Sequence, residues 1–267
     1  MPPVVNPMRT APPRWPAWFG FAALALALLI AIVAGGVLYA IVRSTGAHVS
    51  SDSPGLNVGA TLIQDVVLVG TAVWMASQIA PPRPGQFGLR GVPLKRAVGW
   101  ALLALIIYLT VQFAYVAAVN PHEKQTTLQD LGAGSGGLAT LAIGVLVVGV
   151  APFTEEFFFR GFFYGALRTR FTFVVAALID GVVFGAVHAP TGIEAVPPLI
   201  ALGFAFCMVY EATGSILPTV ALHALNNMVA FGADKQGSWA VGGVVAGAVI
   251  TACIALPRTL KPRPVTV

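Results

Sequence analysis

The sequence predicts an all-α, polytopic membrane protein with about eight transmembrane helices. Of its 267 residues, 57% are hydrophobic and only 9% are charged, whereas soluble domains contain about 25% charged residues. A chain with so few charges cannot cover a globular surface with them, and its high hydrophobicity excludes intrinsic disorder. The apolar residues also fall into segments near the roughly 20 residues that a membrane-spanning helix needs.

Eight apolar segments have this length, and they predict one transmembrane helical domain over residues 17–257. In order, they cover residues 18–42, 58–79, 97–119, 138–167, 171–188, 195–211, 215–231 and 239–256. The first is longer than the roughly 7–15-residue core of a cleavable signal peptide, so we expect it to remain in the mature protein. Residues 1–16 and 258–267 are rich in Pro and are expected to form a disordered arm and a disordered tail.

The basic residues alternate between the two sides of these segments. If both termini are cytoplasmic, the outer loops hold only Arg43, Lys124 and Lys235, and Arg160 stays inside the membrane. The inner segments then hold Arg9, Arg14, Arg83, Arg90, Lys95, Arg96, Arg168, Arg170, Arg258, Lys261 and Arg263. This skew follows the positive-inside rule, so we predict a multi-pass protein of the plasma membrane with both termini in the cytoplasm.

The net charge of +5 needs no nucleic-acid partner, because cytoplasmic loops of membrane proteins carry such an excess. The expected partners are membrane lipids, and the basic segment 83–96 is expected to contact anionic lipid.

The densest group of ionisable residues inside an apolar segment is Glu155, Glu156 and Arg160. Each charge at the bilayer centre costs about 2.5–3.5 kcal/mol, so the group needs a reason to be there. Glu156 and Arg160 are four residues apart and are expected to form an ion pair. Glu155 is rotated by about 100° and sits beside a like charge in a poorly solvated place, which suits a general base. The alternative is a charge network that only ties helices together.

Two further polar groups occur in later apolar segments. Asp180, Phe184 and His188 follow one another at four-residue steps and share one helix face. His223 and Asn227 are also four residues apart and project from one face of their segment. A lone histidine in a membrane is more often a packing residue, but His with Asn at this spacing favours a site.

These polar groups agree in depth. Measured from the cytoplasmic ends of their segments, Glu155 lies roughly 20 Å deep, His188 roughly 26 Å, and His223 and Asn227 roughly 12 and 18 Å. Helix tilt and a kink at Pro152 would close the remaining differences. The sequence therefore predicts that the side chains of the three segments meet around one wet cavity.

The residue types favour hydrolysis of an amide. The chain has no Ser or Cys in an obvious nucleophile setting, no His-Glu-x-x-His and no Gly-rich phosphate loop. A carboxylate and a His can activate water, while a second His and an Asn can donate hydrogen bonds to the oxyanion that forms. We therefore predict an intramembrane endopeptidase whose peptide or protein substrate enters from the membrane or the cytoplasm.

The three motifs resemble the CAAX protease and bacteriocin-processing (Abi) family of intramembrane endopeptidases, which includes the type II CAAX prenyl endopeptidases. The resemblance covers about residues 138–232. In this chain the motifs read Glu155-Glu156-x-x-x-Arg160, Phe184-x-x-x-His188 and His223-x-x-x-Asn227.

The resemblance implies a role for each matching residue. Glu155 and His188 would activate the water, His223 and Asn227 would stabilise the oxyanion, and Glu156 and Arg160 would shape the site. Asp180 departs from the small polar residue expected two turns before His188, and would either support a neighbour or make the site more acidic.

Family members are described both as metal-dependent and as using a glutamate without metal. We expect no cofactor here, because Asn227 suits an oxyanion donor better than a zinc ligand. The alternative is zinc held by Glu155, His188 and His223, which are plausible ligands.

Two other classes of function stay open. Asp65, Glu155 and Asp180 could form the proton relay of a proton-coupled transporter, although the inverted repeats common in transporters are not found in this sequence. The chain could also keep the fold as a non-catalytic membrane scaffold. Proton-driven solute uptake into vesicles without cleavage would favour the transporter.

The remaining conspicuous residues are expected to be structural. Asp65 is expected to bond to another helix, the alternative being a contact with the cavity, and Glu211 is expected to be solvated near the cytoplasmic edge. Cys207 and Cys253 have no spacing typical of disulfides or zinc and are expected to be small core residues. Helix packing is expected at three pairs of glycines four residues apart: Gly161/Gly165, Gly181/Gly185 and Gly243/Gly247.

Overall fold

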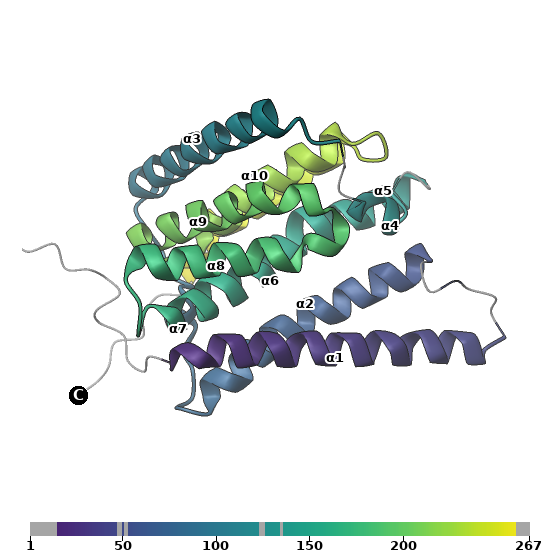
Figure 1. The fold of residues 1–267 in the computed structure, drawn as a ribbon, viewed down its shortest axis with the longest axis horizontal. Coiled ribbons are helices and arrows are strands. Elements are labelled where there is room, and N and C mark those ends of the chain that lie inside the picture. The colour runs from purple at the N-terminus through teal and green to yellow at the C-terminus, as the bar shows by residue number, and fades with distance from the viewer. Residues whose placement is uncertain (1–14, 47–49, 51–52, 123–125, 134–135, 260–267) are drawn as a thin grey trace, which may run out of the picture.

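Helices are the only regular secondary structure in the part of the chain that the structure describes (Figure 1). The computed structural model describes residues 15–46, 50, 53–122, 126–133 and 136–259. The first half forms α1 (Ala17–Ser44), α2 (Pro54–Ser77), the 3-10 turn η2 (Pro84–Phe87), α3 (Leu94–Val119) and α4 (Thr127–Asp130). The middle forms α5 (Gly137–Gly144), the π-helical η3 (Val145–Val150), α6 (Ala151–Glu156), the π-helical η4 (Phe157–Tyr164) and α7 (Gly165–Leu167). The last part forms α8 (Phe173–Val187), η5 (Ala189–Thr191), η6 (Ile193–Ala195), α9 (Val196–Thr213), α10 (Leu217–Ala233) and α11 (Trp239–Thr259).

Seven helical stretches among the described residues are long and apolar enough to cross a membrane, which confirms a polytopic, all-α membrane protein. One of them is continuous from Gly137 to Leu167 and contains α5 to α7 with both π-helical stretches. The eighth predicted segment, 215–231, corresponds to α10, which has only 17 residues. A helix of that length spans about 26 Å, less than the roughly 30 Å of a bilayer core. The described residues thus contain seven stretches that meet the length of a span and α10, which lies at the lower limit of the roughly 17–25 residues that spans contain.

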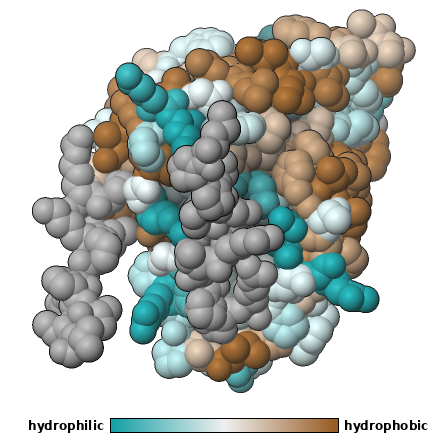
Figure 2. Space-filling view, turned by 90° about the vertical axis from the view of Figure 1, so that its left-hand side faces the viewer, coloured by the Kyte–Doolittle hydropathy of each residue, from teal (hydrophilic) through white to brown (hydrophobic). Residues whose placement is uncertain are grey.

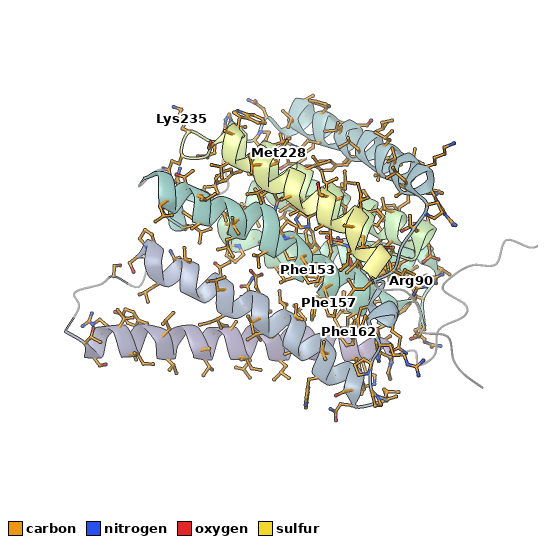
Figure 3. All side chains as sticks on the ribbon, turned by 180° about the vertical axis from the view of Figure 1, so that it is seen from behind. Arg90, Phe153, Phe157, Phe162, Met228 and Lys235 are labelled. Carbon is orange, nitrogen blue, oxygen red and sulfur yellow. The ribbon has the colours of Figure 1, made fainter. Side chains whose placement is uncertain are left out.

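Both ends of the described chain lie at the same end of the helical bundle. The start of α1 and the end of α11 both lie on the right in Figure 3. Arg90 lies at this end, and Lys235 lies at the opposite end (Figure 3). Hydrophilic residues gather on the face of the bundle that includes the chain ends (Figure 2). This arrangement agrees with an even number of crossings, while the side of the membrane that holds the termini stays a prediction.

The boundaries of the predicted arm and tail differ slightly from the structure. Trp15, which falls in the predicted arm 1–16, is buried, and its ring centroid lies 4.9 Å from that of Phe87. The indole packs against the ring of Phe87 in η2 and is shielded from water. The ordered chain therefore begins before α1. At the other end α11 continues to Thr259, past the predicted boundary at 258. Residues 1–14 and 260–267 lie outside the described residues.

Two glycines allow α8 and α9 to approach closely. A Cβ added at Gly181 would lie 2.7 Å from the carbonyl oxygen of Ile200, and one at Gly185 would lie 2.9 Å from that of Val196. The packing predicted for this pair is confirmed. A Cβ at Gly161 would likewise lie 2.7 Å from the Phe87 carbonyl oxygen.

The packing prediction is wrong for the glycine pair on α11. An added Cβ at Gly243 or Gly247 meets no described atom within 4 Å beyond its own helix. The spacing alone could not show this, because it does not say which face of a helix meets a neighbour.

Gly181→Ala is expected to lower the thermal unfolding temperature of the purified protein in detergent. The added methyl group would overlap the Ile200 carbonyl, and overpacking of this kind costs about 1–3 kcal/mol. Gly243→Ala is the matched control, since Ala stabilises a helix interior by roughly 0.5–1 kcal/mol relative to Gly and no neighbour obstructs it. Equal unfolding temperatures for the two variants would contradict this account of the α8–α9 contact.

Candidate active site

A cavity of about 410 Å³ lies at the centre of the bundle. Glu155, His188, His223 and Asn227 all line it, so the structure brings the three predicted groups together. The segment that carries Glu155 contacts both α2 and α10, and its Phe157, labelled in Figure 3, is buried. The helices α1 and α2 supply the facing wall through Leu24, Ala27, Leu28, Thr61, Gln64 and Leu68.

Glu155 points between the two histidines. Its Oε2 atom lies 3.8 Å from Nε2 of His188 and 3.9 Å from Nε2 of His223. Both distances exceed a direct hydrogen bond, which reaches about 3.2 Å, and are suited to a bridging water. This carboxylate oxygen is buried and has no hydrogen-bond partner among the described residues. The site therefore holds an open acceptor flanked by two imidazoles.

Each histidine is oriented by a hydrogen bond at its other ring nitrogen. Nδ1 of His188 lies 2.7 Å from the carbonyl oxygen of Phe184. Because a carbonyl only accepts, this nitrogen carries the proton, and Nε2 of the neutral ring is an acceptor. Nδ1 of His223 lies 3.0 Å from Oε1 of Glu156. Both rings thus present Nε2 to Glu155.

The predicted ion pair between Glu156 and Arg160 is present. The Nη1–Oε1 distance is 2.8 Å, and both side chains are fully buried. Nε of Arg160 lies 3.5 Å from Oδ1 of Asp180, whose side chain is also fully buried. The guanidinium stacks over the ring of Phe184 at 4.6 Å. Asp180 therefore lies behind the site as a second partner of Arg160, and Phe184 packs against the same charge.

Two partners of this charge cluster were not found from the sequence. Arg160 also donates a hydrogen bond of 3.2 Å to the carbonyl oxygen of Gly203, and the thiol of Cys207 donates to Oδ1 of Asp180 at 3.2 Å. Cys207 is buried as predicted, but it binds a carboxylate and is more than a small core residue. Neither contact has a sequence signal, because each joins α9 to a residue far away along the chain.

Asn227 contacts the helix that carries the glutamates. In the π-helical turn before Pro152, backbone N–H groups donate five residues back, as Ala151 does to Leu146. Pro152 has no N–H, so the carbonyl oxygen of Val147 loses its donor. Nδ2 of Asn227 supplies one at 2.9 Å. The disturbance predicted at Pro152 is thus a π-helical turn that Asn227 caps, and the second hydrogen of its amide group has no partner among the described residues.

Two carboxylates outside the motifs have clear partners. Oδ1 of Asp65 on α2 accepts a hydrogen bond of 2.8 Å from Thr154, which confirms the predicted bond to another helix. Glu211 accepts hydrogen bonds from Tyr164 at 2.7 Å and from Arg168 at 2.9 Å. The prediction that Glu211 is simply solvated is therefore wrong, because the fourth span places two donors within its reach. Its hydrogen bonds raise the pKa of the Arg168 guanidinium, which stays charged.

The donor types of Glu155, His188 and His223 suit zinc. Their arrangement does not. Ligand atoms around a tetrahedral zinc lie roughly 3.3 Å apart, whereas Oε2 of Glu155 lies 3.8 and 3.9 Å from the two Nε2 atoms. Within the described ranges no three His, Cys, Asp or Glu side chains are placed to hold a metal ion. We therefore derive no catalytic step through a metal.

Comparison with known proteins identifies the segment that carries this site. Residues 137–229 match the family model described as type II CAAX prenyl endopeptidase Rce1-like. A stretch of 78 residues is 36% identical to the "Putative membrane peptidase YdiL" of Bacillus subtilis (strain 168). That match covers 29% of this chain and 31% of the relative, and no solved structure matches. The resemblance indicated by the three motifs is thereby confirmed for the segment that contains them, while α1, α2 and α3 lie outside it.

Proposed function

We propose that this chain, whose core matches the type II CAAX prenyl endopeptidase family model, is an intramembrane endopeptidase that uses water activated by Glu155 and His188. The observation that carries the proposal is the unpartnered, buried Oε2 of Glu155, which faces two oriented imidazoles across a cavity. Oxygens of Asp65, Glu156 and Asp180 also lack a described partner, but of these four carboxylates only Glu155 lines the cavity, where water or a substrate can reach its free oxygen.

In this mechanism a water molecule lies between Glu155 and His188. It donates one hydrogen bond to Nε2 of His188, and Glu155 takes its other proton as the oxygen attacks the carbonyl carbon. The carbonyl oxygen becomes an oxyanion. It accepts hydrogen bonds from the free amide hydrogen of Asn227 and from Nε2–H of His223, which must carry a proton on both ring nitrogens because its Nδ1–H is donated to Glu156. Glu155 then returns the proton to the leaving nitrogen, and the C–N bond breaks to give an acid and an amine.

The cluster behind the cavity supports this chemistry by holding groups in place. Glu156 accepts hydrogen bonds from both Arg160 and His223, so the ion pair also orients an imidazole of the site. Asp180 holds the far side of the same guanidinium. Their task is positioning, because none of them lines the cavity.

The proposal is tested by incubating the purified protein with a diverse peptide library, with and without a chelator, and analysing the fragments by mass spectrometry. We expect internal cleavage that the chelator leaves unchanged. No cleavage, together with proton-driven solute uptake by vesicles that contain the protein, would replace the proposal with a transporter. Loss of cleavage with the chelator would show that a metal takes part.

Asn227→Ala is expected to lower kcat by about 10²–10³-fold with little change in KM, because an oxyanion donor acts mainly in the transition state. Steady-state kinetics on a peptide that the wild type cleaves would measure this. Thr61→Val is the control, since Thr61 lines the same cavity while its hydroxyl bonds within its own helix, and this variant should keep most of kcat. Because Asn227 also caps Val147, thermal unfolding of both variants must be compared. Similar kcat values for the two variants would remove Asn227 from the oxyanion site.

A further inference from the structure

The second helix presents two polar residues in two different directions. Thr61, Gln64 and Leu68 lie three and four residues apart on one face of α2, and all three line the cavity opposite Glu155. Asp65 is rotated by about 100° from Gln64 and is buried against the fourth span. One face of α2 therefore lines the cavity, and another face bonds α2 to the fourth span.

Gln64 supplies the free polar group of the cavity face. Its side chain is exposed, and it makes no hydrogen bond with any residue that the structure describes. The hydroxyl of Thr61 is already used, because it donates to the carbonyl oxygen of Asn57 in its own helix at 2.8 Å. A carboxamide in an otherwise apolar span is costly unless water or a ligand satisfies it. We therefore expect the carboxamide of Gln64 to form its hydrogen bonds with water or a ligand inside the cavity.

The attachment of α2 determines where Gln64 lies relative to Glu155. Asp65 and Thr154 are both buried, and their 2.8 Å hydrogen bond joins residues 89 positions apart. Gln64 is the chain neighbour of Asp65, and Glu155 is the chain neighbour of Thr154. One buried bond thus sets the axial register of the carboxamide and the catalytic carboxylate on facing walls.

We propose that Gln64 binds the backbone of the peptide substrate beside the scissile bond, with Asp65 as the positioning residue that holds α2 in register. This inference rests on the proposed peptidase function and names how the substrate is recognised. A carboxamide offers one acceptor and two donors, so it can pair with both the N–H and the C=O of a peptide group. In a helical substrate those groups are already bonded within the helix, so the bound segment is extended.

The surroundings of Gln64 favour recognition of the backbone over recognition of a charged side chain. Its neighbours on the facing wall are Leu24, Ala27, Leu28 and Leu68. An apolar wall with one neutral amide offers no counter-charge to an acidic or basic group. A peptide backbone is the part of the substrate whose donors and acceptors match that amide.

The test compares Gln64→Met with wild type on a peptide that the wild type cleaves. Met keeps the length of the side chain and is compatible with lipid, so only the hydrogen-bonding group is lost. KM is expected to rise about 5- to 10-fold, the effect of one hydrogen bond, while kcat stays within about twofold. Gln112→Met is the matched control, because it removes a glutamine amide from α3, which does not line the cavity.

A second measurement identifies the backbone group, and its wild-type arm does not depend on how well a variant folds. Each amide flanking the scissile bond is replaced in turn by an ester, which removes one N–H. Wild type is expected to lose affinity at one position, and Gln64→Met is expected to show no further loss there. Equal penalties at every position in wild type overturn the inference.

The role of Asp65 is tested in the same assay. Asp65→Asn keeps an oxygen that accepts from Thr154 and should retain the wild-type KM. Asp65→Leu should raise KM, and adding Gln64→Met to it should raise KM no further. If the KM increases of Asp65→Leu and Gln64→Met multiply in the double variant, Asp65 does not act through Gln64. If wild type cleaves no peptide, the proposed function and this inference fall together; if wild type cleaves and Gln64→Met has an unchanged KM, only this inference falls.

Discussion

Glu155→Gln is expected to lower kcat for peptide cleavage by about 10³- to 10⁴-fold, the contribution of a general base. The amide cannot take the proton of the attacking water, yet it keeps the shape and hydrogen-bonding capacity of the side chain. Steady-state kinetics on the purified variant would measure the loss. His188→Ala should have a similar effect, because it removes the second acceptor that orients the same water.

The control for this result is a carboxylate that does not line the cavity. Asp234 follows α10, and its Oδ1 accepts the backbone N–H of Gln236 at 2.8 Å, a bond that Asn can also accept. Asp234→Asn should therefore keep wild-type kcat. Thermal unfolding and gel filtration would show that Glu155→Gln is folded. Full turnover by folded Glu155→Gln would refute the assignment of Glu155 as the base.

Arg160→Met is expected to reduce stability by about 3–5 kcal/mol, the usual result when one member of a buried charge pair is removed. Arg160 is fully buried, and its guanidinium is the partner of both Glu156 and Asp180. Met fills much of the same space. The loss of stability therefore comes mainly from the two unpaired carboxylates and less from a cavity. The measurement is the shift in thermal unfolding temperature in detergent.

Two further variants separate charge compensation from packing. Adding Asp180→Asn to Arg160→Met should recover part of the stability, since one of the two unpaired carboxylates becomes neutral. Arg168→Met is the comparison at the bundle edge, where the ion pair with Glu211 is partly exposed, with side chains 24% and 19% accessible. Such partly solvated pairs contribute about 0–1 kcal/mol. An equal loss of stability in Arg168→Met and Arg160→Met would mean that burial of the ion pair does not determine how much stability is lost.

Much of the site could be predicted because its parts are local. The pair Glu156–Arg160 and the pair His223–Asn227 each lie within one helical turn, so sequence spacing alone places them on one face. Because ionisable side chains are costly inside the bilayer, these groups were expected to contact one another. The distances of Glu155 to both histidines agree with that expectation.

The parts that the sequence did not predict depend on contacts between distant segments. Whether Glu211 meets water or Arg168 depends on how α9 packs against the fourth span, a relation that carries no periodic signal. The same holds for the thiol of Cys207 and for the amide of Asn227, which bonds a carbonyl that only a π-helical turn leaves free. Glycine spacing likewise predicted close packing at Gly181, where α9 lies within contact distance, and at Gly243, where no described neighbour does.

By itself the sequence determined that this protein is a helical membrane protein and which polar side chains line its cavity, because hydrophobic length and helical spacing are properties of single segments. The tertiary structure alone decided that α2, which has no recognisable motif, forms a wall of the cavity and is bonded through Asp65 to the neighbour of Glu155. The physical reason is that packing in lipid depends on shape and on rare polar contacts between helices. A segment read in isolation contains neither.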